Sequence, residues 1–245
     1  MKINSPQLNV MNRACMKASK ILIRDFGEIE KLQISEKGPG DFVTASDKKV
    51  EKILIEELQK ARPNYSILSE EIGKIDNDDS FRWIIDPIDG TANFLHGIPH
   101  FAISVGLEHN KEIICGIVYD PIKDEMFVAE KGNGSYLNNQ RIRVSKKNHI
   151  NDCLFATGGN IEKEPNLPFR KSGCAALDMA YVAAGRYDGL FQNNLNLWDI
   201  AAGIILIKEA GGVINEIDLL NNKNIKVIAS SPDINQKLLE KLGKF

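Results

Sequence analysis

Two aspartates stand where a run of β-forming residues ends. Asp86 and Asp89 belong to the stretch Trp83-Ile-Ile-Asp-Pro-Ile-Asp-Gly-Thr-Ala-Asn93. Pro87 pushes the residue before it into the extended region and Gly90 permits a sharp turn, so both carboxylates should project from a strand end. Two carboxylates this close repel each other unless a multivalent cation lies between them. The stretch therefore predicts a site for a hard cation such as Mg²⁺ or Mn²⁺.

The same residue types are also ordinary in a β-turn that leads into a helix, so these dipeptides alone leave a purely structural interpretation open. Further acids occur far away in the chain. Glu70 and Glu71 follow a predicted strand at residues 65–68, where adjacent acids would by themselves indicate a solvated edge. Asp199 follows Trp198 in what should be the first turn of a helix, where an acid is usually a cap or a partner of the helix dipole.

Taken together, Glu70-Glu71, Asp86-Pro-Ile-Asp-Gly-Thr91 and Trp198-Asp199 resemble the inositol monophosphatase family, within the lithium-sensitive, Mg²⁺-dependent phosphatases that include fructose bisphosphatases. The resemblance covers nearly the whole chain and is closest to the bacterial extragenic-suppressor type. It implies a phosphate monoester hydrolase that acts on inositol 1-phosphate by attack of a metal-activated water. Phosphatases of fructose 1,6-bisphosphate, adenosine bisphosphate or histidinol phosphate remain alternatives. So does an accessory factor that contacts RNA polymerase or the ribosomal RNA machinery.

The resemblance also assigns roles to individual residues and implies two or three Mg²⁺ ions, with Mn²⁺ possible. The catalytic group is Asp47, Thr91 and Glu70. The metal ligands are Glu70, Asp86, the Ile88 carbonyl, Asp89 and Asp199. The substrate contacts are Asp89, Gly90, Thr91, Gly173, Cys174, Ala175, Gln192 and Asp199, while Glu71 and Lys37 support the metals from nearby. Four of the metal ligands are acids, namely Glu70, Asp86, Asp89 and Asp199. Without cations, they would carry about four negative charges together and repel a phosphate. A helix beginning at Gly90-Thr91 should add a partial positive charge.

Three positions have further readings. Asp47 also fits, loosely, a helix-capping pattern with Thr44. Gln192 stands seven residues before Asp199, where the family often has an acid, so an uncharged amide replaces a carboxylate there. Residues 158–170 form a shorter segment than in the family, where this segment contributes to subunit contacts. A homodimer is nevertheless the assembly that the resemblance implies.

Hydrophobic periodicity indicates the elements that must position these residues. Ser5-Pro6 predicts a helix start, and residues 36–41 should form an irregular loop before a second helix. Strands are expected at residues 65–68, 81–85, 101–107, 113–119, 126–129, 141–144, 153–156 and 225–229. Helices are expected at residues 173–184, from Trp198 to Gly211-Gly212, and at 232–242.

The order of these elements agrees with the α/β (α+β) fold that the resemblance implies, a layered αβαβα sandwich. It would form one domain over residues 1–245. The N-terminal α+β half, about 1–137, would hold an antiparallel sheet. The C-terminal α/β half, about 138–245, would hold a smaller mixed sheet.

Composition limits the remaining possibilities. The chain has 245 residues, 43% hydrophobic and 26% charged, and a net charge of −2, which gives no general attraction to nucleic acid. Four widely spaced cysteines, Cys15, Cys115, Cys153 and Cys174, contain no CxxC motif and suggest a reducing compartment. The N-terminus lacks the apolar region of a signal peptide, and no apolar stretch is long enough to span a membrane. We therefore expect a cytoplasmic protein.

Overall fold

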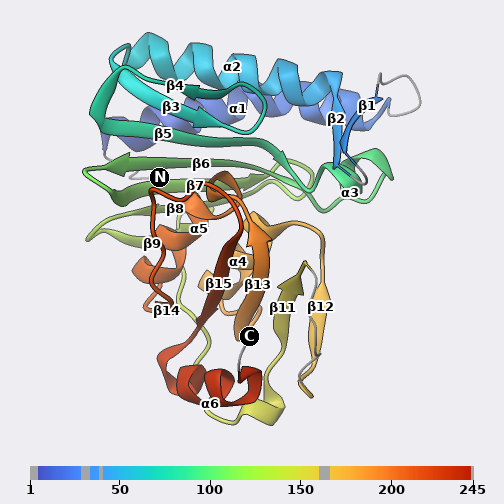
Figure 1. Cartoon of the computed structure of the whole chain (residues 1–245), viewed down its shortest axis with the longest axis vertical. Coiled ribbons are helices and arrows are strands. Elements are labelled where there is room, and N and C mark those ends of the chain that lie inside the picture. The colour runs from blue at the N-terminus through green and yellow to red at the C-terminus, as the bar shows by residue number, and fades with distance from the viewer. Residues whose placement is uncertain (1–4, 29–33, 39–40, 160–165, 244–245) are drawn as a thin grey trace.

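The computed structural model describes residues 5–28, 34–38, 41–159 and 166–243. In these ranges, helices and sheets alternate in five layers (Figure 1), with one pair of helices over the first sheet, a second pair between the sheets and one helix beyond the second sheet. The layers contain α1 (Pro6–Phe26) and α2 (Ala45–Ala61), then α4 (Ala175–Ala183) and α5 (Leu197–Glu209), then α6 (Pro232–Leu242). The layered αβαβα fold is confirmed.

The first sheet has eight strands in the order β10-β9-β8-β7-β6-β5-β3-β4. The bounds are β3 (Tyr65–Ser69), β4 (Gly73–Ile75), β5 (Asp78–Asp89), β6 (Ala102–His109), β7 (Glu112–Asp120), β8 (Glu125–Glu130), β9 (Gly134–Leu137) and β10 (Gln140–Arg141). Strands β6 to β8 form the expected antiparallel meander, and β9, which the sequence did not predict, extends it. The expectation of a wholly antiparallel sheet is wrong, because β3 and β5 are parallel. Strand β4 reverses the chain after β3 and occupies its outer side, so the next reversal brings β5 alongside β3 in the same direction.

The second sheet has five strands in the order β12-β11-β13-β15-β14, and it is mixed as expected. The bounds are β11 (Phe155–Gly158), β12 (Phe169–Lys171), β13 (Gly189–Leu195), β14 (Val213–Ile214) and β15 (Ile225–Ser230). Strand β11 runs parallel to both of its neighbours, whereas β15 is antiparallel to both of its own. Strand β13 lies at the centre, although the sequence did not predict a strand there.

Two local expectations are wrong. The segment expected to be an irregular loop instead contains β1 (Ile34–Gly38), which pairs in antiparallel fashion with β2 (Asp41–Thr44). The strand expected at residues 141–144 is only the two-residue β10, because the chain then leaves the sheet. There the amide of Ile142 bonds to the Ser135 carbonyl, and the amide of Val144 bonds to the Ala210 carbonyl.

Helix ends follow the chemistry of their first residues. The Ser5 hydroxyl accepts from the Leu8 amide, and Pro6 occupies the first turn of α1, as the sequence predicts. The apolar stripe of α1 then packs with α2 against the first sheet. All four cysteines are buried and free of disulfides. Among the described residues, no helix combines the length and the apolar character needed to cross a membrane.

Helix α5 lies directly against the first sheet because two strands carry glycine beneath it. A Cβ added to Gly106 would lie 2.9 Å from the Cβ of Ala201. A Cβ added to Gly116 would lie 2.6 Å from Cγ2 of Ile205 and 2.7 Å from the Ala202 carbonyl oxygen. These contacts leave no room for a side chain, so the two glycines set how closely α5 approaches the sheet. This approach also places the first turn of α5 near the strand ends.

Candidate active site

Four carboxylates from three parts of the chain line one cavity of about 230 Å³. Glu70 follows β3, Asp86 and Asp89 belong to the end of β5, and Asp199 lies in the first turn of α5. We call this side of the cavity the carboxylate wall. The sequence singled out these four residues as one set, and the fold brings them together.

The parallel pairing of β3 with β5 places the first two of these acids side by side. Ser69 is in register with Ile85, and the Glu70 amide donates to the Ile85 carbonyl at 3.3 Å. Because parallel strands end on the same edge of a sheet, Glu70 and Asp86 leave the two strands at one point. The pairing of β5 with β6 then shifts its register between Asp86 and Asp89, which lets both carboxylates of the motif face the cavity.

Backbone amides hold the carboxylates of the motif and of α5. Asp86 Oδ1 accepts from the Ile88 amide at 3.0 Å. Asp89 Oδ2 accepts from the Ala176 amide at 2.6 Å, at the start of α4. Asp199 Oδ2 accepts from the Asn196 amide at 2.7 Å, so this residue is a helix cap as well as a lining residue. The structural reading of Asp199 as a cap is therefore confirmed, and its reading as a metal ligand stays a prediction.

The electrostatics of this wall favour protonation unless positive charge is supplied. Burial, followed by the charges of Glu70, Asp89 and Asp199, raises the pKa of Asp86 well above its usual range. Burial likewise raises the pKa of Asp89 to about 6, although Cys174 and nearby amides oppose the shift. The pKa of Asp199 is raised by burial and then by the charge of Asp89. Each ionised carboxylate makes its neighbours harder to ionise.

The predicted water-orienting pair lies beside the carboxylate wall. The Thr91 hydroxyl lies 2.9 Å from the Ile88 carbonyl oxygen and 3.4 Å from Asp47 Oδ1. Asp47 is fully buried in α2, and Thr91, to which it bonds, lines the cavity. Helix α3 (Thr91–Leu95) has only five residues. It begins where the sequence predicts, with Gly90 as its N-cap, and the anion-binding contribution expected at its N-terminus stays a prediction.

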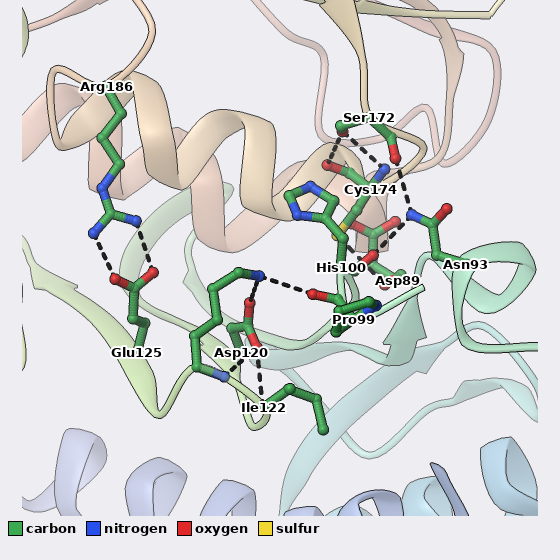
Figure 2. A network of polar contacts seen from close by, with 11 residues as sticks. Asp89, Asn93, Pro99, His100, Asp120, Ile122, Glu125, Ser172, Cys174 and Arg186 are labelled. Atoms are coloured by element: carbon green, nitrogen blue, oxygen red, sulfur yellow. Dashed lines mark hydrogen bonds and ion pairs between the residues drawn. The ribbon is translucent and has the colours of Figure 1, made fainter. Parts of the chain in front are cut away.

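The family-implied substrate contacts in the other part of the lining are uncharged, and we call this part the neutral wall; Asp178, a fifth acid of the lining, lies there beside Gln192. The neutral wall consists of Gly173, Cys174 and Ala175 at the start of α4, with Gln192 of β13. The Cys174 thiol donates to Asp89 Oδ2 at 2.9 Å, and Figure 2 shows the two side chains together. Burial raises the pKa of this thiol well above its usual range, so Cys174 acts here as a neutral hydrogen-bond donor. The family-implied substrate contacts on this side thus line the same cavity as the acids.

Of the family-implied residues whose side chains the structure describes, Asp47 and Glu71 are not among those that line the cavity. Glu71 follows Glu70 in the turn after β3, and its amide donates to Glu51 Oε1 at 3.0 Å. Lys37 lies in β1, and its side chain is outside the part of the chain that the structure describes. The support predicted from Glu71 and Lys37 therefore stays a prediction.

Glu51 is a residue that the sequence analysis missed. Its side chain is 2% exposed, and Oε1 accepts from the Ser69 hydroxyl and from the amides of Glu71 and Ile72. These donors surround Glu70, so Glu51 fixes the turn that carries it. Glu51 lies one helical turn after Asp47 on α2. That spacing, four residues on one face, was the available signal.

Asn93 is a second missed residue, although it lies within the central motif. Its Nδ2 donates to the His100 carbonyl at 2.8 Å and to the Ser172 carbonyl at 2.9 Å (Figure 2). Ser172 immediately precedes the neutral wall, so Asn93 ties that wall to α3. Lys123 bonds to Asp120 and to the Pro99 carbonyl. The residue next to Pro99 is His100, so Lys123 and Asn93 hold the same short segment. No local pattern could reveal the bonds of Asn93 to Ser172 and of Lys123 to Pro99, since these partners are 79 and 24 residues away.

The donor set suits a divalent cation that prefers oxygen ligands. The cavity offers the four carboxylates of the carboxylate wall, the carboxyl group of Asp178 and the Ile88 carbonyl, and no imidazole is among its lining residues in the described chain. Hard oxygen donors of this kind select Mg²⁺ or Mn²⁺ over Zn²⁺. Within the described residues, however, no three His, Cys, Asp or Glu side chains already stand in an arrangement that could hold a metal ion. The fit is therefore one of chemical type and charge.

Comparisons with known proteins agree with this site. The profile of the inositol monophosphatase family matches residues 4–244. The chain is 45% identical to the inositol-1-monophosphatase of Mesorhizobium japonicum over 98% of this chain and 97% of that protein. It is 36% identical to the Nus factor SuhB of Haemophilus influenzae, over 97% and 96%. Among solved structures, the extragenic suppressor protein suhB of Bartonella henselae superimposes with a TM-score of 0.89 at 44% identity, covering 98% of this chain and 99% of that one.

Proposed function

This chain belongs to the inositol monophosphatase family, a family of phosphatases, and we propose that it hydrolyses a phosphate monoester of inositol or a related polyol in a Mg²⁺-dependent reaction. One observation carries the proposal. Glu70, Asp86, Asp89 and Asp199 line a single cavity from three separate parts of the chain, beside the pair formed by Thr91 and Asp47. Burying four acids together is costly for a scaffold that has no cation to bind.

In this proposal, one Mg²⁺ ion would be held by Glu70, Asp86 and the Ile88 carbonyl, and a second by Asp86, Asp89 and Asp199. When bound, the ions supply positive charge that neutralises the acids, lowers the pKa of the attacking water and stabilises the leaving oxygen. Water attacks the phosphate directly in this proposal, so the reaction needs no phosphorylated enzyme and none of the acids acts as a nucleophile.

The chain's own groups orient the water and take its proton. Thr91, held between Asp47 and the Ile88 carbonyl, accepts a hydrogen bond from the attacking water and aims its lone pair at phosphorus. As the new P–O bond forms, the proton of the water passes through the Thr91 hydroxyl to Asp47. The P–O bond to the alcohol breaks, and the leaving alkoxide takes a proton from solvent. The products are inorganic phosphate and the free alcohol.

Phosphate release from a panel of substrates, with and without Mg²⁺, tests the proposal. The panel contains myo-inositol 1-phosphate, fructose 1,6-bisphosphate, adenosine bisphosphate and histidinol phosphate. We expect release only with Mg²⁺ and the highest kcat/KM for the inositol ester. A higher value for another member would reassign the substrate, and metal-independent release would overturn the proposed chemistry. Inhibition by lithium and a homodimeric assembly are part of the same proposal, and sedimentation velocity measures the latter.

A second role is favoured by one of the relatives. The protein of Haemophilus influenzae that is 36% identical to this chain is named a Nus factor, which denotes a transcription factor. We propose contact with RNA polymerase or the ribosomal RNA machinery as the second candidate. Affinity capture of RNA polymerase by the wild type and by a metal-site variant tests it. Equal capture by both would separate this role from catalysis, and no capture by either would remove the candidate.

A further inference from the structure

Two buried polar side chains form a pair on the neutral wall. Gln192 Nε2 donates to Asp178 Oδ2 at 2.6 Å, and the Ser172 hydroxyl donates to Asp178 Oδ1 at 2.7 Å. Gln192 is 3% exposed and Asp178 is 1% exposed, and both line the cavity. Both oxygens of Asp178 are thus engaged, one with each neighbour.

The rest of Gln192 is held by its strand. In β13 it lies in register with Gly158 of β11 on one side and with Val227 of β15 on the other. A Cβ added to Gly158 would lie 3.4 Å from both Cδ and Oε1 of Gln192, so the amide lies against that glycine. With the backbone and one face of the amide held, rotation about the last side-chain bond decides which end of the amide faces the cavity.

The hydrogen bond to Asp178 decides that rotation. A glutamine amide has donors on its nitrogen and acceptors on its oxygen, so the two ends present opposite polarity. Because Nε2 is turned toward Asp178, Oε1 is turned away from it, and no group in the described part of the chain donates to this oxygen. Resting on the proposed function, we propose that Asp178 is a positioning residue that presents the Gln192 carbonyl to the cavity, where it accepts a hydrogen bond from a substrate hydroxyl group.

The amide also suits the carboxylate behind it. A glutamate at position 192 would set a second carboxylate within hydrogen-bonding distance of Asp178, and two acids so placed cannot both ionise. The neutral amide avoids this repulsion. The Gln192 carbonyl can accept a hydrogen bond from a substrate hydroxyl group. The ionised oxygens of a second phosphate group have no hydrogen to donate to it. The subsite therefore favours monophosphates of polyhydroxy alcohols over bisphosphates.

Selectivity between two substrates tests the proposal. Myo-inositol 1-phosphate carries hydroxyl groups, and phenyl phosphate carries none. In Asp178→Asn, an N–H group replaces one of the two acceptor oxygens, so Ser172 and Gln192 compete for the single acceptor that is left and Gln192 is held less firmly. We expect the ratio of kcat/KM for the inositol ester to that for phenyl phosphate to fall about tenfold, mainly through KM for the inositol ester.

Two further variants sharpen the test. Gln192→Leu removes the acceptor at similar size and should lower the same ratio by a similar factor. The double variant should lose no more than either single variant, because both changes remove one interaction. Asp188→Asn is the matched control. Asp188 is another buried acid, which accepts from the Lys147 side chain and the Leu154 amide away from the cavity, and its variant should keep the wild-type ratio.

Equal losses on both substrates in Asp178→Asn, or additive losses in the double variant, would overturn the positioning role. If Asp178→Asn does not fold, monodeoxy analogues of inositol 1-phosphate decide between wild type and Gln192→Leu. For one of these analogues, we expect kcat/KM of the wild type to be about tenfold below its value for inositol 1-phosphate. For Gln192→Leu, the same analogue should lower kcat/KM no further. Equal losses in both proteins would overturn the proposal. A wild type that releases phosphate from neither ester overturns the proposed function, and this inference with it.

Discussion

The carboxylate wall and the neutral wall line one cavity and meet where the Cys174 thiol bonds to Asp89, but they are built in different ways. Glu70, Asp86 and Asp89 leave adjoining strands of the eight-stranded sheet, so their charges accumulate at one edge. The neutral wall comes from the first turn of α4 and from the centre of the five-stranded sheet, and it presents Cys174 and Gln192. One wall has an excess of charge, and the other presents uncharged polar groups to the cavity.

This difference separates two tasks. The carboxylate wall needs a cation, so it suits the chemical step, which depends on positive charge near phosphorus. The neutral wall can discriminate among the uncharged parts of a substrate without disturbing that charge. Asp199 comes from the C-terminal half of the chain, like the neutral wall, but it belongs to the carboxylate wall because the first turn of α5 places it there. Changes to the two walls should therefore have different consequences.

The largest expected effect is on the carboxylate wall. Asp89→Asn should lower Mg²⁺-dependent phosphate release by on the order of 10³-fold, because it removes a charge that holds the metal and faces the reacting phosphate. The unfolding midpoint should stay equal or rise, since a buried charge with a raised pKa is lost. Steady-state kinetics and thermal denaturation measure the two. Near-normal activity would contradict the assignment of Asp89.

A smaller effect is expected behind the carboxylate wall. Glu51→Gln should weaken Mg²⁺ binding, measured by calorimetry, roughly tenfold, because the turn that carries Glu70 loses a charged acceptor of three hydrogen bonds. Glu57→Gln is the matched control on the same helix, where Glu57 bonds to Lys17 at the surface. If both variants bind Mg²⁺ with wild-type affinity, Glu51 does not position Glu70.

The packing of α5 on the first sheet can be disturbed without changing any residue that lines the cavity. Gly116→Ala should lower the free energy of unfolding by about 1 to 3 kcal/mol, because its Cβ would overlap the backbone of Ala202 and push α5 from the sheet. The shift would also move Asp199, so Mg²⁺ affinity should fall with stability. Urea denaturation and calorimetry test both. A stable variant with unchanged affinity would show that α5 need not lie so close.

The smallest effect concerns pH and the neutral wall. Burial raises the pKa of Asp178 to about 8, while Ser172 and Gln192 oppose the shift and Asp89 adds to it. Cys174 and Tyr187 are the other titratable groups that interact with Asp178. Because the folded state holds the Asp178 proton more tightly than the unfolded state does, this residue lowers the free energy of unfolding as pH rises from about 4 to about 8.

In metal-free protein, Asp178→Asn should therefore lose less stability than the wild type between pH 5 and pH 8. The difference in free energy of unfolding between the variant and the wild type should change by at least about 1 kcal/mol, in favour of the variant, over this pH range. Urea denaturation at several pH values measures it. Parallel curves would mean that Asp178 titrates normally and that burial does not perturb it.

Several parts of the molecule could be predicted from local patterns. The cap at Ser5, the meander of β6 to β8 and the helix α6 follow from capping chemistry and from hydrophobic periods of a few residues. The central motif identified Asp86 and Asp89 because proline and glycine shape the backbone beside them. Glu70 and Asp199 joined the set only through the family resemblance, since each has an ordinary structural reading by itself.

The sequence by itself determined the type of chemistry, through acids placed at strand and helix ends, and the composition of each layer. Only the tertiary structure decided how those acids meet. The parallel pairing of β3 with β5 puts Glu70 next to Asp86, and it depends on a crossover that no local pattern contains. The partners of Glu51, Asn93 and Asp178 are likewise 14 or more residues away, apart from the second contact of Asn93 and the near contact of Asp178 with Ser172. Local sequence fixes backbone geometry over a few residues, whereas hydrogen bonds between distant segments exist only after the layers have packed.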